Sequence, residues 1–210
     1  MPARPTTSSI LVLLAVCLNP FAAHAQATAE SEALDAFEAA KLELPVRDRL
    51  EYFAGAFEAG ETGLARKTKS VDARPAIPGE VVVSIIAGDG VETVSPPAAE
   101  GDWVVRNRCP ETGNEEILVT AAKFPTRYGE AQTAADAEGY REFIPTGAEM
   151  RYFVVPEEDG EFMMEAPWGE MQIFKPGDAV VQVVSDPNDT YRIYGASFVC
   201  TYEILEEAGE

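Results

Sequence analysis

The side chains that most often carry enzyme chemistry are scarce in this chain. His24 is the only histidine among the 210 residues, and it lies in an N-terminal segment typical of a leader peptide. Serine and cysteine nucleophiles usually need an imidazole base, and zinc, copper and non-haem iron are commonly held by imidazole nitrogens. The acidic turns do not match the calcium-binding loop pattern either. We therefore expect no metal and no cofactor, and we lean towards a protein that is not an enzyme.

Two aspartates could nevertheless act as a catalytic pair. Asp102 and Asp178 each follow a glycine and precede a short apolar run. Two carboxylates held close together share a proton and split their pKa values, which a hydrolase can use. The alternative role is structural, because an Asp after Gly at the start of a strand commonly holds the turn by accepting hydrogen bonds from nearby amides. We favour the structural role and keep the hydrolase as a rival hypothesis.

Tryptophan is the preferred candidate for a binding contact. Trp168 lies between turn-forming residues in the segment Pro167-Trp168-Gly169. A ring in such a turn can offer a large contact area and an N–H donor to a partner. Trp103, at the start of an expected strand, is a second candidate, with packing into the core as the alternative for both rings.

Positive charge is concentrated in one part of an otherwise acidic chain. This group comprises Arg106, Arg108, Lys123 and Arg127. Guanidinium groups could hold a small anion such as a carboxylate or a phosphate. The alternative is that these side chains pair across strands with acidic neighbours, namely Glu111, Glu115 and Glu116. We retain Arg106, Arg108 and Arg127 as candidate binding residues.

Residues 1–25 have the pattern of a cleaved secretory signal. An apolar run from Ile10 to Leu18 is followed by a small-residue site that predicts cleavage after Ala25. The run is too short to span a bilayer, and no later segment is long and apolar enough to do so. Processing as a lipoprotein at Cys17 is the alternative. We expect a periplasmic or secreted protein without a transmembrane segment after signal removal.

Two cysteines remain after the signal, Cys109 and Cys200. An even pair in an oxidising compartment indicates a disulfide, and free thiols are the alternative. The net charge of −20 at pH 7 argues against nucleic acids as partners. The expected partner is therefore an unknown protein or small-molecule ligand of the cell envelope.

The chain pattern divides into six segments. Helical spacing of apolar residues predicts a helical hairpin over 26–60, after the signal peptide of 1–25. The polar stretch 61–73 is expected to be a linker, and β-branched runs between turn signals predict β-rich segments at 74–130 and 141–206. An Ala-rich acidic stretch, 131–140, is expected to be a linker helix.

The two β-rich segments have matching landmarks in the same order. Gly101-Asp102-Trp103-Val104-Val105 returns as Gly177-Asp178-Ala179-Val180-Val181, and the spacing of Phe124 and Tyr128 returns in Phe198 and Tyr202. Matched order over a fixed period indicates two copies of one unit. The predicted fold is α+β: an N-terminal helical hairpin followed by two tandem, related small β-rich domains that are barrel-like.

The second copy resembles a family of small, uncharacterised bacterial and phage domains named for a Pro-Gly-Asp-Tyr-Gly (PGDYG) motif. The matching residues are Pro176-Gly177-Asp178, Val180-Val181, Phe198 and Thr201-Tyr202-Glu203. They cover roughly the last forty residues, and the first copy is a weaker match because Glu100 replaces the proline. The resemblance implies kinship of fold and no established activity.

These observations favour a non-enzymatic binding or interaction protein of the cell envelope. The alternatives are the carboxylate-based hydrolase that uses Asp102 and Asp178, and a structural subunit of an envelope complex. Whether a concave pocket lies at the seam between the two copies is the observation that would help most in choosing among these hypotheses.

Overall fold

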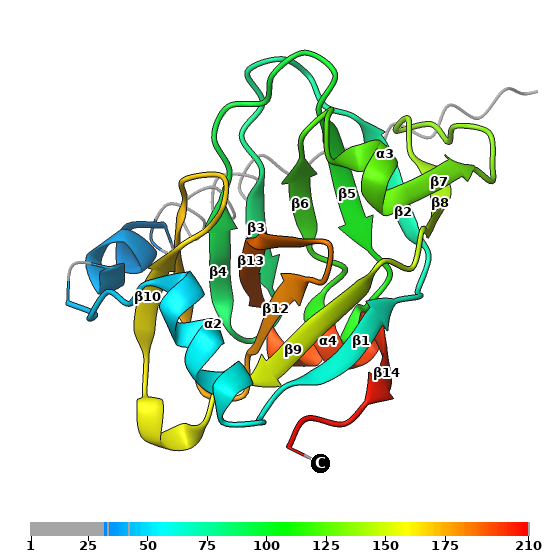
Figure 1. Ribbon diagram of the computed structural model, residues 1–210. Coiled ribbons are helices and arrows are strands. Elements are labelled where there is room, and N and C mark those ends of the chain that lie inside the picture. Colours follow the sequence, from blue (N-terminus) through cyan, green and yellow to red (C-terminus); the bar gives the residue numbers. More distant parts are fainter. Residues whose placement is uncertain (1–31, 33, 42, 210) are drawn as a thin grey trace, which may run out of the picture.

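The computed structural model describes residues 32, 34–41 and 43–209 (Figure 1). The expected signal peptide, its cleavage site after Ala25 and the alternative site at Cys17 lie outside these residues. Within the described residues, no helix has both the length and the apolar character needed to cross a membrane.

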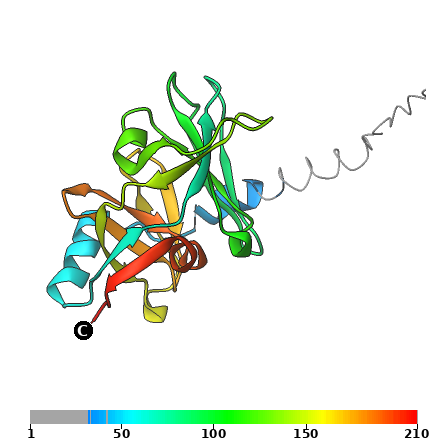
Figure 2. The ribbon, with the colours of Figure 1, turned by 90° about the vertical axis from the view of Figure 1, so that its right-hand side faces the viewer.

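Two five-stranded antiparallel sheets form the body of the protein. The first sheet has the spatial order β6 (Glu116–Val119), β5 (Trp103–Asn107), β2 (Val71–Pro75), β8 (Arg141–Pro145) and β7 (Tyr128–Ala131). The second has the order β13 (Asp186–Ile193), β12 (Ala179–Val183), β9 (Glu149–Val154), β1 (Gly63–Lys67) and β14 (Tyr202–Glu206). Figure 2 shows the green strands of the first sheet and the orange and red strands of the second as two adjoining lobes.

In each sheet, the fourth strand in the spatial order is one that directly precedes, in sequence, a strand of the other sheet. β1 lies directly before β2 in sequence, yet it pairs with β9 and β14 of the second sheet. β8 lies directly before β9, yet it pairs with β2 and β7 of the first sheet. If the chain is divided into the runs β1–β7 and β8–β14, the first strand of each run, β1 or β8, lies in the sheet of the other run, so the two sheets exchange one strand. The two spatial orders then match, because β6-β5-β2-β8-β7 corresponds position by position to β13-β12-β9-β1-β14.

The connections between strands also occur in matching places. Hairpin β3 (Val83–Ile86) and β4 (Gly90–Val94) follows β2, and hairpin β10 (Phe162–Glu165) and β11 (Met171–Phe174) follows β9. A short helix precedes the last strand of each run: α3 (Phe124–Arg127) before β7, and α4 (Gly195–Thr201) before β14. Two short 3-10 helices are also present: η1 (Pro110–Thr112) follows β5, and η2 (Glu157–Asp159) follows β9.

The aromatic spacing found in the sequence marks the junction of each short helix with its strand. Phe124 and Tyr128 have ring centroids 5.1 Å apart, and Phe198 and Tyr202 have theirs 5.0 Å apart. In both cases the Phe lies in the helix and is buried, and the Tyr is the first residue of the strand. Each pair thus closes the apolar face between its sheet and its short helix.

Helix α2 (Arg49–Glu58) covers one face of the second sheet. Its N-cap is Asp48, whose carboxylate accepts hydrogen bonds from the amides of Leu50 and Glu51 and so satisfies free donors of the first turn. Its buried Phe53 contacts a cluster that includes Phe153 of β9. Full burial of a side chain of this size contributes about 2 kcal/mol.

Period-two alternation gives the second sheet two apolar faces. Neighbouring residues of β12 point to opposite sides: Val180 packs with the α2 cluster, and Val181 packs with Tyr152 and Phe198 on the other face. The strand is therefore covered on both faces, which explains its continuous apolar run.

The α+β fold class is confirmed, because the described residues form mainly β-strands together with a few helices. The barrel-like form is wrong, because the described strands form two open five-stranded sheets and no closed barrel. The expected linker 61–73 contains β1 and part of β2. The stretch 131–140, expected to be a linker helix, contains turns and bends and no helical residue. Within 26–60, residues 34–41 and α2 are helical.

Candidate functional site

A cavity of about 390 Å³ lies between the two sheets. Its size is within the range of small-molecule binding pockets, which typically enclose about 300–1,000 Å³. Side chains from both sheets, from hairpin β10–β11 and from helices α3 and α4 line it. Much of the wall is apolar or aromatic, and it includes Ile117, Leu118, Val119, Tyr128, Met150, Val183, Tyr191, Ile193 and Tyr202.

A network of polar side chains forms one part of the wall. Lys67 Nζ donates to Asn107 Oδ1 at 2.6 Å, and Asn107 Nδ2 donates to Glu115 Oε1 at 2.8 Å. Ser197 Oγ of α4 also donates to Glu115 Oε1, at 2.7 Å, and the Thr112 hydroxyl donates to the other carboxylate oxygen. Glu115 is only 4% exposed, so these hydrogen bonds compensate for its removal from water. The network joins side chains that lie far apart in the chain.

Lys67 is the exceptional member of this network. It is the last residue of the exchanged strand β1, and its side chain lines the cavity. Burial lowers the pKa of Lys67 to about 8 from its ordinary 10.5, because an ammonium loses hydration there. Glu115 opposes this lowering, whereas the positive charge of Arg127 adds to it.

An ion-pair cluster joins the two sheets on the same wall. Asp189 of β13 is 4% exposed, and its Oδ2 lies 2.9 Å from Lys123 Nζ and 3.2 Å from Arg127 Nη2. The Arg127 guanidinium also lies over the ring of Tyr191, 5.0 Å from the centroid. Burial alone would lower the pKa of Arg127, but Tyr191 and Asp189 raise it above its ordinary value. Arg127 therefore stays positively charged.

A second buried cluster centres on Arg192, which is 4% exposed. Its Nε donates to Asp178 Oδ2, and its Nη1 lies 3.2 Å from Glu92 Oε1 of β4. Ser84 Oγ donates to the other oxygen of Glu92 at 2.9 Å. Burial raises the pKa of Glu92 even though Arg192 opposes the shift. The cluster links hairpin β3–β4 to the second sheet.

The structure brings Trp168, the preferred binding candidate, to the cavity wall. The side chain is 41% exposed and its ring centroid lies 5.7 Å from that of Tyr191. Its Nε1 donates to Glu170 Oε2 at 2.9 Å, and Glu170 Oε1 accepts from the amide of Val94 at 2.8 Å. Glu170 thereby positions the tryptophan and ties the two hairpins together.

The other aromatic and basic candidates lie elsewhere, except Arg127. Trp103 stacks on Phe124 with centroids 4.2 Å apart in the core of the first sheet. Arg106 pairs with Glu116 at 2.8 Å, as one of the sequence alternatives predicted. Arg108 pairs with two acidic side chains that the sequence did not indicate, Asp72 and Glu142. Trp103, Arg106 and Arg108 are not among the residues that line the cavity.

Asp102 and Asp178 hold turns and do not form a catalytic pair. Asp102 Oδ2 accepts from the amide of Ala99 at 2.8 Å, and its Oδ1 accepts from the amide of Ala121 at 2.9 Å. Both carboxylate oxygens are therefore used to fix the backbone within the first sheet.

The carboxylate of Asp178 has the same role in the second sheet. Its Oδ2 accepts from the amide of Lys175 at 2.8 Å, and its Oδ1 accepts from the amide of Gly195 at 3.2 Å. The preceding Gly177 has φ 87°, and Gly101 has φ 89°, a conformation that glycine adopts without strain. The hydrolase hypothesis is wrong in its central requirement, because the two carboxylates are bound within separate turns.

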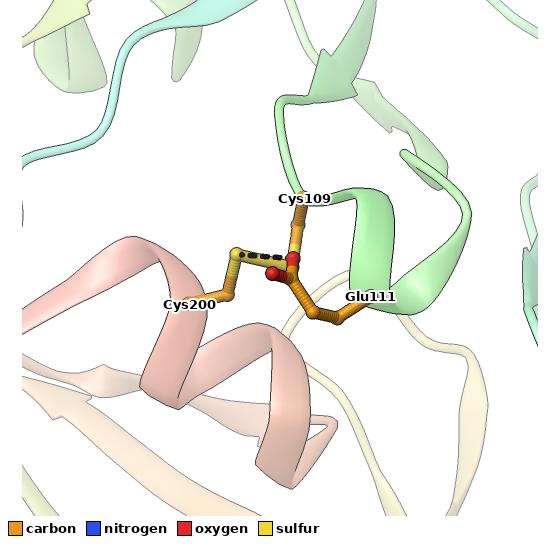
Figure 3. Close-up of side chains that lie close together, drawn as sticks. All are labelled: Cys109, Glu111 and Cys200. Atoms are coloured by element: carbon orange, nitrogen blue, oxygen red, sulfur yellow. Dashed lines mark hydrogen bonds between the residues drawn. A yellow bond between two sulfur atoms is a disulfide. The ribbon is translucent and has the colours of Figure 1, made fainter.

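Cys109 and Cys200 are joined in a disulfide, with Cα atoms 6.1 Å apart (Figure 3). The bond connects the start of η1 to α4, next to the Glu115 network. Glu111 Oε2 lies 3.4 Å from Cys109 Sγ and 3.5 Å from Cys200 Sγ. This is the one group of three metal-type ligands among the described residues, and its sulfurs are bonded to each other and offer no thiolate to an ion.

Comparisons with protein-family models, with curated proteins and with solved structures found no match for this chain. Sequence reasoning had identified Trp168 and Arg127 but missed Lys67, Asp189 and Arg192. For Asp189 the sequence contains a signal, because Asn114-Glu115 and Asn188-Asp189 occur in matching order in the two segments.

Proposed function

We propose that this protein binds a small amphipathic molecule in the cavity between its two sheets and acts as a non-enzymatic binding protein. The observation that carries the proposal is the cavity itself, about 390 Å³ in volume and lined by both sheets. Its apolar wall would hold an apolar body, and a few fixed polar groups would orient a head group. Trp168 adds a partly exposed aromatic surface at the same wall.

The proposed location is the periplasm or the exterior of the cell. It is supported by the apolar N-terminal run and the small-residue site before Gln26. The Cys109–Cys200 disulfide supports it as well, since such bonds persist in oxidising compartments. An envelope ligand is consistent with this location.

We further propose that the chain consists of two copies of one unit, of which the second is related to the PGDYG-motif domains. The matching strand orders of the two sheets support the duplication. So do the shared turn roles of Asp102 and Asp178. A cavity between two related units would then lie where their facing surfaces meet.

The test uses N-phenyl-1-naphthylamine, an apolar probe whose fluorescence rises when it leaves water. We expect saturable binding of one probe molecule per chain. Val183 lines the cavity, whereas its neighbour Val184 is an exposed side chain that does not. Val183→Trp would fill the cavity and is expected to weaken probe binding at least tenfold.

The matched control is Val184→Trp, which adds the same ring outside the cavity and should leave probe affinity unchanged. Trp168→Ala should weaken binding severalfold because it removes part of the wall. Equal affinities for Val183→Trp and Val184→Trp, or binding that does not saturate, would contradict the proposed function.

A further inference from the structure

Four cationic side chains lie at the cavity wall, and three of them are neutralised by carboxylates. Lys123 and Arg127 pair with Asp189, and Arg192 pairs with its own two carboxylates. Lys67 is the exception, because among the described residues no carboxylate forms an ion pair with it, and its hydrogen bond is to the Asn107 amide. The cavity therefore contains one cation without a direct counter-ion.

The nearest carboxylate in this network is already occupied. Glu115 accepts hydrogen bonds from Asn107, Thr112 and Ser197, and the Asn107 amide separates it from Lys67. An ammonium group has three donors, and the hydrogen bond to Asn107 uses one of them. Lys67 is half-buried, and an ammonium that has lost part of its hydration without gaining a paired anion is unfavourable. This position would therefore be stabilised by an acceptor with negative charge.

The other charged groups near Lys67 do not supply that acceptor. Arg127 of α3 is positive and disfavours the ammonium further. The ring of Tyr202 at the start of β14 lies 5.9 Å from Lys67 Nζ and gives only a weak cation–π contact. With a pKa of about 8, Lys67 is still mostly protonated at neutral pH.

We infer that the ligand of this cavity is an amphipathic carboxylate whose head group pairs with Lys67 and whose apolar body lies against the surrounding wall. The inference rests on the proposed function and names the ligand class for the same cavity. Met150 and Tyr128 line the cavity together with Lys67 and provide apolar surface for such a body. Two of the other wall carboxylates, Glu92 and Asp189, have cationic partners. Glu170 is held by hydrogen bonds from the Trp168 indole and the Val94 amide, at the hairpins.

The experiment compares octanoate, octanol and octylamine by isothermal titration calorimetry on the full chain at pH 7.5. These probes share one alkyl chain and differ in head group. The wild type is expected to bind octanoate at least tenfold more tightly than octanol, and octylamine least tightly. Lys67→Met should abolish the preference for octanoate while octanol still binds. Lys69→Met is the matched control, since Lys69 is an exposed lysine whose Nζ lies near Cys200, and it should keep the preference.

The second measurement is the number of protons that the protein takes up when octanoate binds. Pairing with a carboxylate raises the pKa of an ammonium, so octanoate binding to the wild type at pH 8.5 should take up protons. Uptake is measured from the dependence of the heat on the ionisation enthalpy of the buffer, and it should vanish in Lys67→Met and in Lys67→Gln.

The wild-type comparison can overturn the inference even if a variant at position 67 fails to fold, and retained preference for octanoate in a folded Lys67→Met would overturn the role of Lys67. Equal affinities for octanoate and octanol, or a preference for octylamine, would overturn the carboxylate while leaving the cavity as a binding site. Absence of binding by both octanol and N-phenyl-1-naphthylamine would instead overturn the proposed function.

Discussion

Asp102 and Asp178 make the same pair of backbone hydrogen bonds in the two sheets. Each carboxylate accepts one hydrogen bond from the amide three residues earlier in the chain. Each accepts a second from an amide next to a short helix: Ala121, just before α3, for Asp102, and Gly195, the first residue of α4, for Asp178. They differ in one respect, because Asp178 also holds the buried guanidinium of Arg192. The role that the two aspartates share is structural.

Replacing either aspartate by asparagine should lower stability, and by different amounts. Asp178→Asn removes one of the two carboxylates that pair with the buried Arg192, and it is expected to cost about 3 kcal/mol. Asp102→Asn changes only the turn hydrogen bonds and is expected to cost about 1 kcal/mol. Urea unfolding of the two variants beside the wild type measures both values. Similar losses would show that the Arg192–Asp178 pair adds little to the turn contacts.

Reduction of the disulfide should destabilise the protein without a change in sequence. The bond closes a loop with a sequence separation of 91 residues. Loop-closure entropy for that length corresponds to about 4.6 kcal/mol. Urea unfolding with and without dithiothreitol measures the loss. A double variant, Cys109→Ser with Cys200→Ser, should unfold like the reduced wild type and should not respond to the reductant.

Lys67 should make stability depend on pH in a defined window. Its pKa is about 8 in the folded protein and about 10.5 when exposed, so the unfolded chain binds more protons between these values. The free energy of unfolding therefore rises with pH across the window, and Lys67 should contribute about 2 kcal/mol of that rise between pH 7 and pH 10. We expect Lys67→Met to lack this increment when both proteins are unfolded in urea at each pH. Parallel pH profiles for the two proteins would contradict the lowered pKa.

Two glycines should respond in opposite directions to alanine. Gly55 lies in the exposed interior of α2 with open space around it, so Gly55→Ala should stabilise the protein by about 0.5–1 kcal/mol. At Gly195 a Cβ would collide with the backbone of Gly177, which cannot move without breaking the Asp178 turn. Gly195→Ala should therefore destabilise by at least about 2 kcal/mol. Thermal unfolding of the two variants measures both shifts, and a neutral Gly195→Ala would mean that this turn adapts.

Local patterns predicted much of the secondary structure. The β-branched run at 81–86 contains strand β3, and the Phe-x-x-x-Tyr spacing marks both helix–strand junctions. Strand β1 was missed because Gly63–Lys67 is short, contains no β-branched or aromatic residue and ends in two charged residues. Its conformation is decided by partners far away in the chain, β9 and β14, rather than by its own composition.

The candidate site was predictable only where a side chain has a local signal. Trp168 was identified from the turn residues around it, and it lines the cavity. Glu115 was expected to pair with the basic group, yet it binds Asn107, Thr112 and Ser197. Lys67 could not be recognised, because its burial results from the contact between the two sheets, and a single sequence does not report that contact.

The exchanged strand has a consequence for how the chain is made. β1 is translated first among the strands, but Leu64 finds its neighbours only when Arg151 and then Glu206 have left the ribosome. Until that moment the nascent polypeptide has an open β edge, which is the kind of surface that recruits other extended chains. A premature stop shortly before Tyr202 would leave that edge permanently available, so nonsense products of this gene should aggregate even though most of their sequence is intact.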